Sequence, residues 1–361
     1  MAGKLGVNNR AAQFLGGAFI ALTLSVFASS SASAAVVPDG PRLAVVKHTL
    51  FPYRFDLETV DETGAQPLHL AGGGPRKRPL PQEFTPPSWS PDGSMLVFSG
   101  LARRADDWPR SVRLYISAAD GSGLRPLKGT HGADEPKFAP DNRTVFFTRY
   151  LFRSRVNRQG KRESVVIGGS IWSVDVFGGA PRRITPRRKG ALMYPASFSP
   201  DGGTLLASRS IRRKPWDVVT LQLDTGDMAV LLHGAEDPVY SPDGSRIAFV
   251  RWRRFEAEKS GDSWTSDIFT VRAGGGGLRR ITDGVGNDYS QTWDPSGEQL
   301  AFVRYLPERY EPDELGYGSA VLQVNADGSC LSPVLRPSLD TAFFGVAWQP
   351  GPGREAGRIK C

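Results

Sequence analysis

Ionisable side chains lie in the short connections that precede several predicted strands. They are His131, Asp134, Glu135, His233, Asp237 and Asp288. Carboxylates and imidazoles that converge on one cavity can exchange protons with a substrate or ligate a metal ion. The sequence therefore offers a candidate acid–base site at the mouth of a channel. The alternative, for each residue taken alone, is an ordinary surface or capped side chain with no role in a site.

The motifs of common hydrolases and nucleotide-binding proteins are incomplete. The segment Gly261-Asp262-Ser263-Trp264-Thr265 lacks the final glycine of a nucleophile elbow. No His-Glu-x-x-His zinc motif occurs, and the glycine run at 274–277 lacks the lysine of a phosphate-binding loop. We therefore assign no catalytic residue and expect neither a metal nor a cofactor.

A repeated turn-and-strand unit positions these residues. Its clearest copy, residues 239–251, joins a Ser-Pro-Asp-Gly turn to an apolar run with the two-residue period of a strand. Proline sets φ for the turn, aspartate bonds to the turn backbone, and glycine accepts a positive φ. Further copies centre on Pro91, Pro140, Pro200 and Pro295, and half copies stand at Pro38 and Pro350.

A second hairpin follows each unit. Its turns fall near residues 63–64, 120–121, 178–179, 225–226, 274–277 and 327–328. Two hairpins per repeat predict four-stranded sheets, and repeats of this length are typical of a β-propeller. We predict an all-β chain, a six-bladed β-propeller with four strands per blade, over residues 35–353, followed by a tail at 354–361.

The half copies predict how the propeller closes. Residues 42–48 supply a second strand without a first, and residues 345–348 supply a first strand without a second. We predict that the C-terminal strand pairs with the N-terminal strands, near 42–48, 54–60 and 66–70. Closure of this kind removes most unpaired sheet edges.

Cations recur nine residues after the proline of the repeat. Five of the six positions are basic: Lys47, Arg149, Arg209, Arg251 and Arg304. They fall where the second strand of each predicted blade ends. Two interpretations stay open: the cations pair with carboxylates of neighbouring blades, or they form a ring that faces a partner.

Four long connections are predicted on the same face, at residues 101–112, 150–169, 252–266 and 305–319. They are longer than a simple hairpin requires, and long loops on one face usually carry function. Aromatic rings among charges suit a protein-binding hot spot or a sugar-stacking platform, although the rings can also pack the loops onto the rim. The candidate binding residues are Trp108, Tyr150, Phe152, Trp252, Phe255, Trp264, Tyr305, Tyr310 and Tyr317.

The N-terminus and the net charge predict an exported protein. Residues 1–34 have the pattern of a signal peptide, with Lys4 and Arg10 before an apolar run at 14–27 and Ala32-Ser33-Ala34 at the cleavage site. After cleavage we expect no stable membrane span. The chain carries +8 overall, and +6 remains beyond residue 34. That charge favours anionic partners, and export argues against nucleic acid.

The repeats resemble the propeller of the TolB family. The resemblance rests on Ser-Pro-Asp-Gly at 90–93, 199–202 and 241–244, and on Arg-Arg-Ile-Thr at 182–185 and 279–282. It covers roughly residues 36–353, without the α/β domain that precedes the propeller in TolB. It implies an exported protein-binding propeller. The fold also serves serine peptidases and pectin-fragment lyases, where several channel histidines hold a metal; here only His131 and His233 would approach a channel.

The two cysteines of the chain are Cys330 and Cys361. An oxidising compartment permits them to pair. The tail after Pro350 is long enough to reach Cys330 on the adjacent blade. We predict a disulfide between them.

The functional prediction is an exported, monomeric binding propeller, periplasmic or secreted. We expect it to dock an envelope protein or an anionic cell-wall polymer on its long-loop face, without catalysis of its own. The alternative is a polysaccharide-acting enzyme, a lyase or hydrolase, with its site at the propeller channel.

Overall fold

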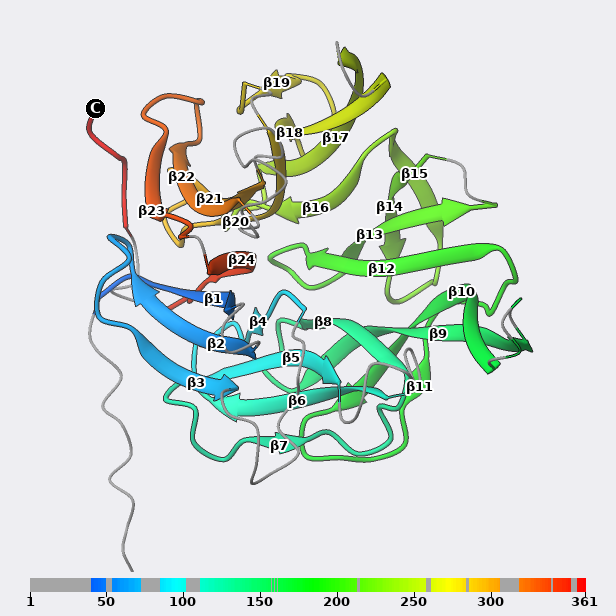
Figure 1. Ribbon diagram of the computed structural model, residues 1–361. Coiled ribbons are helices and arrows are strands. Elements are labelled where there is room, and N and C mark those ends of the chain that lie inside the picture. The colour runs from blue at the N-terminus through cyan, green and yellow to red at the C-terminus, as the bar shows by residue number, and fades with distance from the viewer. Residues whose placement is uncertain are drawn as a thin grey trace, which may run out of the picture. The chain divides into compact units, whose positions relative to one another are not determined.

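The computed structural model describes residues 40–49, 54–72, 85–101, 111–156, 158, 160, 162–212, 215–257, 261–283, 286–305, 318–338, 340–351 and 356–361. The predicted signal peptide lies outside these residues. The regular elements of the described part are all β-strands (Figure 1). Within it, no helix is long and apolar enough to cross a membrane.

The strands pair into antiparallel sheets in chain order. One sheet contains β4 (Ser88–Trp89), β5 (Met95–Leu101), β6 (Val112–Ala118) and β7 (Arg125–Pro126). The next contains β8 (Ala133–Phe138), β9 (Thr144–Val156), β10 (Arg162–Asp175) and β11 (Arg182–Arg183). A third contains β12 (Ala191–Phe198), β13 (Thr204–Ile211), β14 (Asp217–Gln222) and β15 (Met228–His233).

Two further sets of four are joined by one parallel pair, Ser266 with Asn287. The first set is β16 (Glu236–Tyr240), β17 (Arg246–Ala257), β18 (Gly261–Arg272) and β19 (Arg279–Arg280). The second set is β20 (Asn287–Trp293), β21 (Gln299–Tyr305), β22 (Ser319–Asn325) and β23 (Ser332–Leu335). Together they form an eight-stranded sheet.

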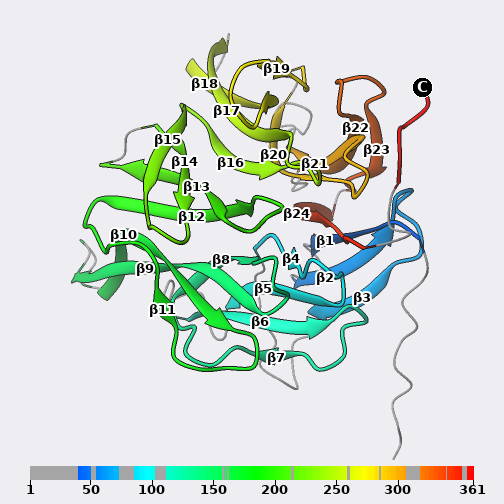
Figure 2. The same cartoon turned by 180° about the vertical axis from the view of Figure 1, so that it is seen from behind.

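The two ends of the described chain share the remaining sheet. Its order is β24 (Thr341–Trp348), β1 (Arg42–Thr49), β2 (Arg54–Asp61) and β3 (Leu68–Gly72). The pairing runs from Leu43 opposite Trp348 to Thr49 opposite Thr341. Figure 1 and Figure 2 view the molecule from opposite sides, and both show β24 beside β1. The predicted pairing of the C-terminal strand with the N-terminal strands is therefore present.

The repeated turn has the predicted hydrogen bonds. In the clearest copy, Ser241 Oγ donates to Asp243 Oδ1 at 2.5 Å, and the backbone N–H of Ser245 donates to the same oxygen at 3.1 Å. These bonds lower the pKa of Asp243 to about 2. Gly244 has φ +70°, and a Cβ there would lie 2.8 Å from a ring carbon of Pro200. Glycine is therefore needed both for the turn and for the approach of the neighbouring sheet.

The first strands of successive sheets contact one another in sequence: β4 with β8, β8 with β12, β12 with β16, β16 with β20, β20 with β24, and β24 with β4. Hydroxyl groups at one position of the repeat connect alternate pairs. Ser88, Ser197 and Thr292 each accept a hydrogen bond from a backbone N–H of the next first strand, at 3.1, 3.1 and 3.3 Å. The apolar core lies between the faces of neighbouring sheets, where Leu114 of β6 and Phe147 of β9 share one cluster.

Two of the predicted long loops are largely strand. β9 pairs with β10 as far as Val156 opposite Arg162, and β17 pairs with β18 as far as Ala257 opposite Gly261. The β-branched run Val165-Val166-Ile167 lies within the first extension, and such residues are enriched in strands. Most of the other two loops lies outside the described residues.

Cys330 and Cys361 form the predicted disulfide. The tail that carries Cys361 also binds the outside of its neighbouring sheet. Asn325 exchanges hydrogen bonds of 3.0 and 2.8 Å with the backbone of Ile359, and Gln299 Nε2 donates to the carbonyl of Gly357 at 2.7 Å. The tail is thus held by side chains as well as by the disulfide.

Candidate functional site

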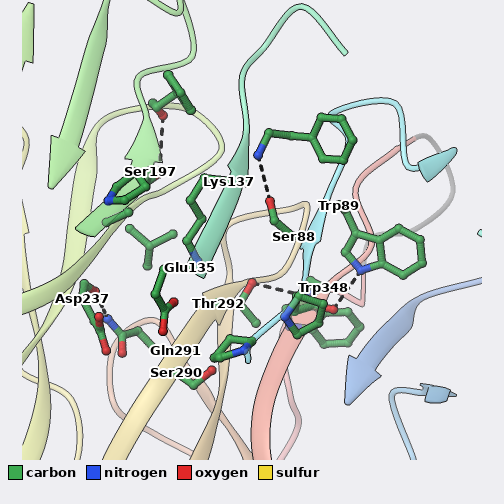
Figure 3. Close-up of a pocket in the computed structure, with 18 of the residues that line it drawn as sticks. Ser88, Trp89, Glu135, Lys137, Ser197, Asp237, Ser290, Gln291, Thr292 and Trp348 are labelled. Atoms are coloured by element: carbon green, nitrogen blue, oxygen red, sulfur yellow. Dashed lines mark hydrogen bonds between the residues drawn. The ribbon is translucent and has the colours of Figure 1, made fainter. Parts of the chain in front are cut away.

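A cavity of about 640 Å³ is lined by the first strand of every sheet (Figure 3). The repeat prolines Pro91, Pro140, Pro200 and Pro350 lie among its walls. The charged lining residues Glu135, Lys137 and Asp237 come from β8 and β16. The cavity therefore combines apolar walls with a small charged cluster, the usual composition of a binding site.

The charged cluster is built on irregular strands. The pairing register shifts between Asp134 and Lys137 in β8, and between Glu236 and Val239 in β16. The residues inside these bulges, Glu135 and Asp237, have φ of +51° and +50°. A bulge leaves a residue outside the ladder and changes the direction of its side chain. Ser290 of β20 repeats the feature with φ +55°, and all three residues line the cavity.

The pKa of Glu135 is raised to about 8. Removal from bulk water is the largest cause, and the nearby carboxylates of Asp134 and Asp237 raise it further while Lys137 opposes them. In Figure 3 the carboxyl group of Glu135 extends toward Asp237 and Gln291. Glu135 is therefore protonated at neutral pH and is available as a hydrogen-bond donor or a weak acid.

Asp237 faces the open interior of the same cavity. The side chain is exposed to the cavity, and its partial removal from bulk water raises the pKa of the carboxyl group, against the effect of Lys137. The side-chain amide of Gln291 donates a hydrogen bond to the backbone carbonyl of Asp237, which fixes the bulge to β20. Ser208 Oγ accepts from the backbone N–H of Asp237 at 2.9 Å. The backbone of Asp237 is thus held from both sides.

Asp134 lies behind the cavity wall. Its carboxylate accepts hydrogen bonds from Ser99 Oγ at 2.5 Å and from the hydroxyl of Tyr150 at 2.8 Å. Tyr150 is buried, so it is not a surface ring of the long-loop face. Its hydroxyl lies 3.4 Å from that of Tyr194, which lines the cavity. Asp134 and Tyr150 therefore support the cavity wall from behind.

One exposed aromatic ring connects the long hairpins to this site. Trp252 is 44% exposed, and its indole N–H donates to Glu236, the residue before Asp237. Burial and the charge of Asp237 raise the pKa of Glu236 to about 7, and the bond from Trp252 opposes that rise. Of the other aromatic candidates, Phe152 and Tyr305 are half-buried.

The side chains of the other five aromatic candidates are not described. Phe255 and Trp264 lie in the paired ends of β17 and β18, where only the backbone is described. Trp108, Tyr310 and Tyr317 lie outside the described residues.

Both histidine candidates lie away from the cavity lining. His131 is exposed in the turn before β8 and does not line the cavity. His233 was expected near the channel, which is wrong. It ends β15, the outermost strand of its sheet, with Nδ1 2.9 Å from a carboxylate oxygen of Asp217. The strand runs on to residue 233, so the connection to β16 starts only after the histidine.

Asp288 forms a buried ion pair and is likewise not part of the lining. Arg304 Nε and Nη2 lie 2.6 and 2.8 Å from its two carboxylate oxygens. Arg304 also reaches Asp283 at 3.3 Å. Within the described residues, no group of three His, Cys, Asp or Glu side chains is placed to hold a metal ion.

The predicted ring of cations pairs within sheets. Lys47, Arg209 and Arg304 contact acids on the adjacent strand of their own sheet, at 3.7, 3.5 and 2.6 Å. Arg149 lies 4.4 Å from the ring centre of Trp172, and Arg251 lies over Phe249. Arg304 alone also reaches an acid outside its own set of strands, Asp283 in the connection after β19. For the other four side chains, the expected ion pairs between neighbouring blades are not found in the described structure.

The lining residues that sequence reasoning missed include Lys137, Tyr194, Tyr289 and Gln291. A signal for one of them exists. Lys137 stands three residues before its repeat proline, where the other copies carry Ser, Ser, Val, Thr and Ala. A single lysine among small or apolar residues in a buried strand indicates a polar environment.

Comparisons with known proteins agree with this fold. No family model matches the sequence. The chain is 29% identical over 234 residues to an uncharacterized protein, Atu1656, of Agrobacterium fabrum, which covers 62% of this chain and 67% of that one. It is 35% identical over 181 residues to a TolB homolog of Chlorobium luteolum, covering 50% of this chain but 37% of the relative.

The solved structure of TolB from Acinetobacter baumannii matches with a TM-score of 0.63 at 18% identity. The match covers 86% of this chain and 67% of that chain. The predicted resemblance to the TolB-like propeller is confirmed at the level of the fold.

Proposed function

We propose that this TolB-like chain is an exported six-bladed propeller that binds a segment of a cell-envelope protein at its central cavity. Support for six blades comes from the six sets of four strands and from the sequential contacts of their first strands. Support for export comes from the signal-peptide pattern of residues 1–34.

The observation that carries the proposal is the pair of acids held in the cavity wall. Glu135 and Asp237 both adopt positive φ, a conformation that is costly for residues other than glycine. Both also have raised pKa values, so folding holds them where ionisation is unfavourable. Strain and perturbed ionisation together are characteristic of functional sites. A ligand cation entering the cavity would favour the ionised carboxylates and so offset the raised pKa values.

The chemistry of the site favours a basic group of the partner, a lysine or arginine side chain or an amino terminus. Such a group would bond to Asp237 and displace Lys137 from its vicinity. The partner's backbone would pass Tyr194 and Tyr289, and the exposed ring of Trp252 would supply apolar contact next to Glu236.

The test is capture from envelope extract with the tagged mature protein. The cavity variant Glu135→Gln/Asp237→Asn is compared with a control, Asp227→Asn/Glu298→Gln, which makes the same two kinds of substitution at exposed positions. We expect one protein to be captured by the wild type and the control and lost by the cavity variant. Equal capture by all three, or no specific capture, would contradict the proposal.

One observation favours a second candidate, an enzyme acting on polysaccharides. A carboxyl group protonated at neutral pH beside a second carboxyl group is an arrangement that glycoside cleavage uses. Glu135 would then act as the acid and Asp237 as the base. Incubation with cell-wall polysaccharides would produce new reducing ends, and Glu135→Gln would abolish them. Absence of products from the wild type on every polymer tried would reject this candidate.

A further inference from the structure

Positive charge is concentrated in one part of the chain. Residues 149–214 contain fifteen Lys and Arg but three Asp and Glu, a net charge of +12, although the whole chain carries +8. The rest of the chain is therefore net negative. Twelve of the fifteen cations are arginines. Charge that only keeps a protein soluble is spread over its surface. Charge concentrated in one segment instead indicates a surface that binds an anionic partner.

Six exposed cations of this segment define what we call the basic face: Arg153, Arg158, Arg187, Arg188, Lys189 and Arg212. No acid among the described residues lies within ion-pair distance of any of the six, although nearby Arg155 does pair with Glu163. None of the six lines the central cavity. The basic face is therefore separate from the proposed protein-binding site.

Backbone contacts join two segments of the basic face, residues 187–189 and Arg212, to each other and to β10, the strand that pairs with β9. The backbone N–H of Arg212 donates to the carbonyl of Gly190 at 2.6 Å, and the N–H of Gly190 donates to Ile167 at 2.8 Å. A Cβ at Gly168 would lie 2.8 Å from the carbonyl oxygen of Arg188. The connection that carries the three consecutive cations thus runs between β10 and the end of β13.

Crowding of like charges extends inward from this face. Burial lowers the pKa of Arg149, and the nearby charge of Arg187 lowers it further. Arg149 is stacked over Trp172 and has no carboxylate partner among the described ion pairs. A bound anion would relieve this repulsion.

The hairpin formed by β9 and β10 projects from the face. β9 has 13 residues and β10 has 14, whereas β13 and β14 of the next sheet have 8 and 6. The far ends of β9 and β10 reach the right-hand edge of Figure 1. Val156, at the end of β9, is 62% exposed between Arg155 and Arg158. The hairpin therefore presents an apolar side chain flanked by cations.

We propose that the basic face docks the protein on an anionic phospholipid bilayer through the headgroup phosphates. Arginine forks match phosphate oxygens in pairs. Cations spread over three segments require an array of anions, which a leaflet supplies. An exposed valine on a protruding basic hairpin is also suited to the boundary between headgroups and acyl chains.

Vesicle sedimentation tests the proposal. The vesicles contain phosphatidylcholine alone or phosphatidylcholine with phosphatidylglycerol. The variant Arg187→Gln/Arg188→Gln/Lys189→Gln is compared with Arg279→Gln/Arg336→Gln/Lys360→Gln, which removes the same residue types from exposed positions elsewhere. Each cation near an anionic surface strengthens binding about fivefold. We expect the first variant to bind phosphatidylglycerol vesicles about a hundredfold more weakly than wild type.

The control variant should bind like wild type, and added salt should weaken wild-type binding. Equal loss of vesicle binding in both variants would mean that only the net charge matters, and would overturn the proposal. Wild-type protein that binds phosphatidylglycerol vesicles no better than phosphatidylcholine vesicles would also overturn it. Inorganic polyphosphate is a second probe: binding to it without binding to vesicles would assign the face to a soluble polymer instead. The first variant should still capture an envelope protein through the cavity. The proposals for the cavity and for the basic face can therefore be refuted independently.

Discussion

Replacing Glu135 by glutamine should change how the stability of the protein depends on pH. The pKa of Glu135 is raised from 4.5 to about 8 in the folded protein. Between these values the unfolded chain has lost this proton and the folded chain keeps it. Stability contributed by the group is therefore complete below pH 4.5 and is lost progressively as the pH rises to about 8. Glutamine does not titrate, so the variant avoids this loss.

The size of the effect follows from the same interval. At about 1.4 kcal/mol for each pH unit, the rise from 4.5 to about 8 corresponds to about 5 kcal/mol. The cavity has room for water, which solvates the carboxylate and reduces that figure. The quantity of interest is the free energy of unfolding of Glu135→Gln minus that of wild type. We expect this difference to increase by about 2 kcal/mol, in favour of the variant, between pH 4 and pH 9.

Urea unfolding at both pH values measures this double difference. Any effect of the amide on packing is the same at both pH values and cancels. Glu298→Gln, an exposed position, serves as the control and should show no double difference. If the free energy of unfolding of Glu135→Gln follows that of wild type at both pH values, the raised pKa and the account of the cavity are wrong.

Three further substitutions test the framework. Replacing Cys330 and Cys361 by serine opens a loop whose ends are 31 residues apart, and should lower the free energy of unfolding by about 3 to 4 kcal/mol, measured in urea without reductant. Arg304→Met leaves the buried carboxylate of Asp288 unpaired and should lower stability by about 3 to 5 kcal/mol, whereas a much smaller loss would mean that water reaches the pair. Trp293→Phe removes a 3.2 Å hydrogen bond to a carbonyl of β16 and should lower the melting temperature by a few degrees, with about 1 kcal/mol lost.

The repeats predicted the fold well because turn chemistry is local. A proline, an aspartate and a glycine in fixed order specify one turn, and Asp243 makes the bonds expected of it. The pairing of residues 345–348 with residues 42–48 followed from two incomplete repeats. The disulfide followed from the same arrangement, since it placed the tail beside Cys330.

The site was less accessible to sequence reasoning because it depends on backbone irregularity. Glu135 and Asp237 were among the candidates, but nothing in their neighbours indicates a bulge with positive φ. Asp134 is adjacent to Glu135 and yet faces Ser99 and Tyr150 behind the wall. The side chains of these two consecutive residues thus point in different directions, so that Glu135 lines the cavity and Asp134 supports its wall.

Strand ends were the other source of error. The extension of β9 to Val156 converts a predicted loop into a hairpin. The extension of β15 to His233 moves a candidate ligand to the outer edge of its sheet. Both depend on pairing with a neighbouring strand, which a single segment does not reveal.

Photo-cross-linking from inside the cavity tests the central claim most directly. A photoreactive amino acid is placed at Tyr194, which lines the cavity, or at Val230, which is 39% exposed on β15. Both proteins are irradiated with envelope extract. The account predicts one cross-linked partner from position 194, lost when Asp237→Asn is added, and none from position 230. The same partner from both positions, or none from position 194, would contradict it.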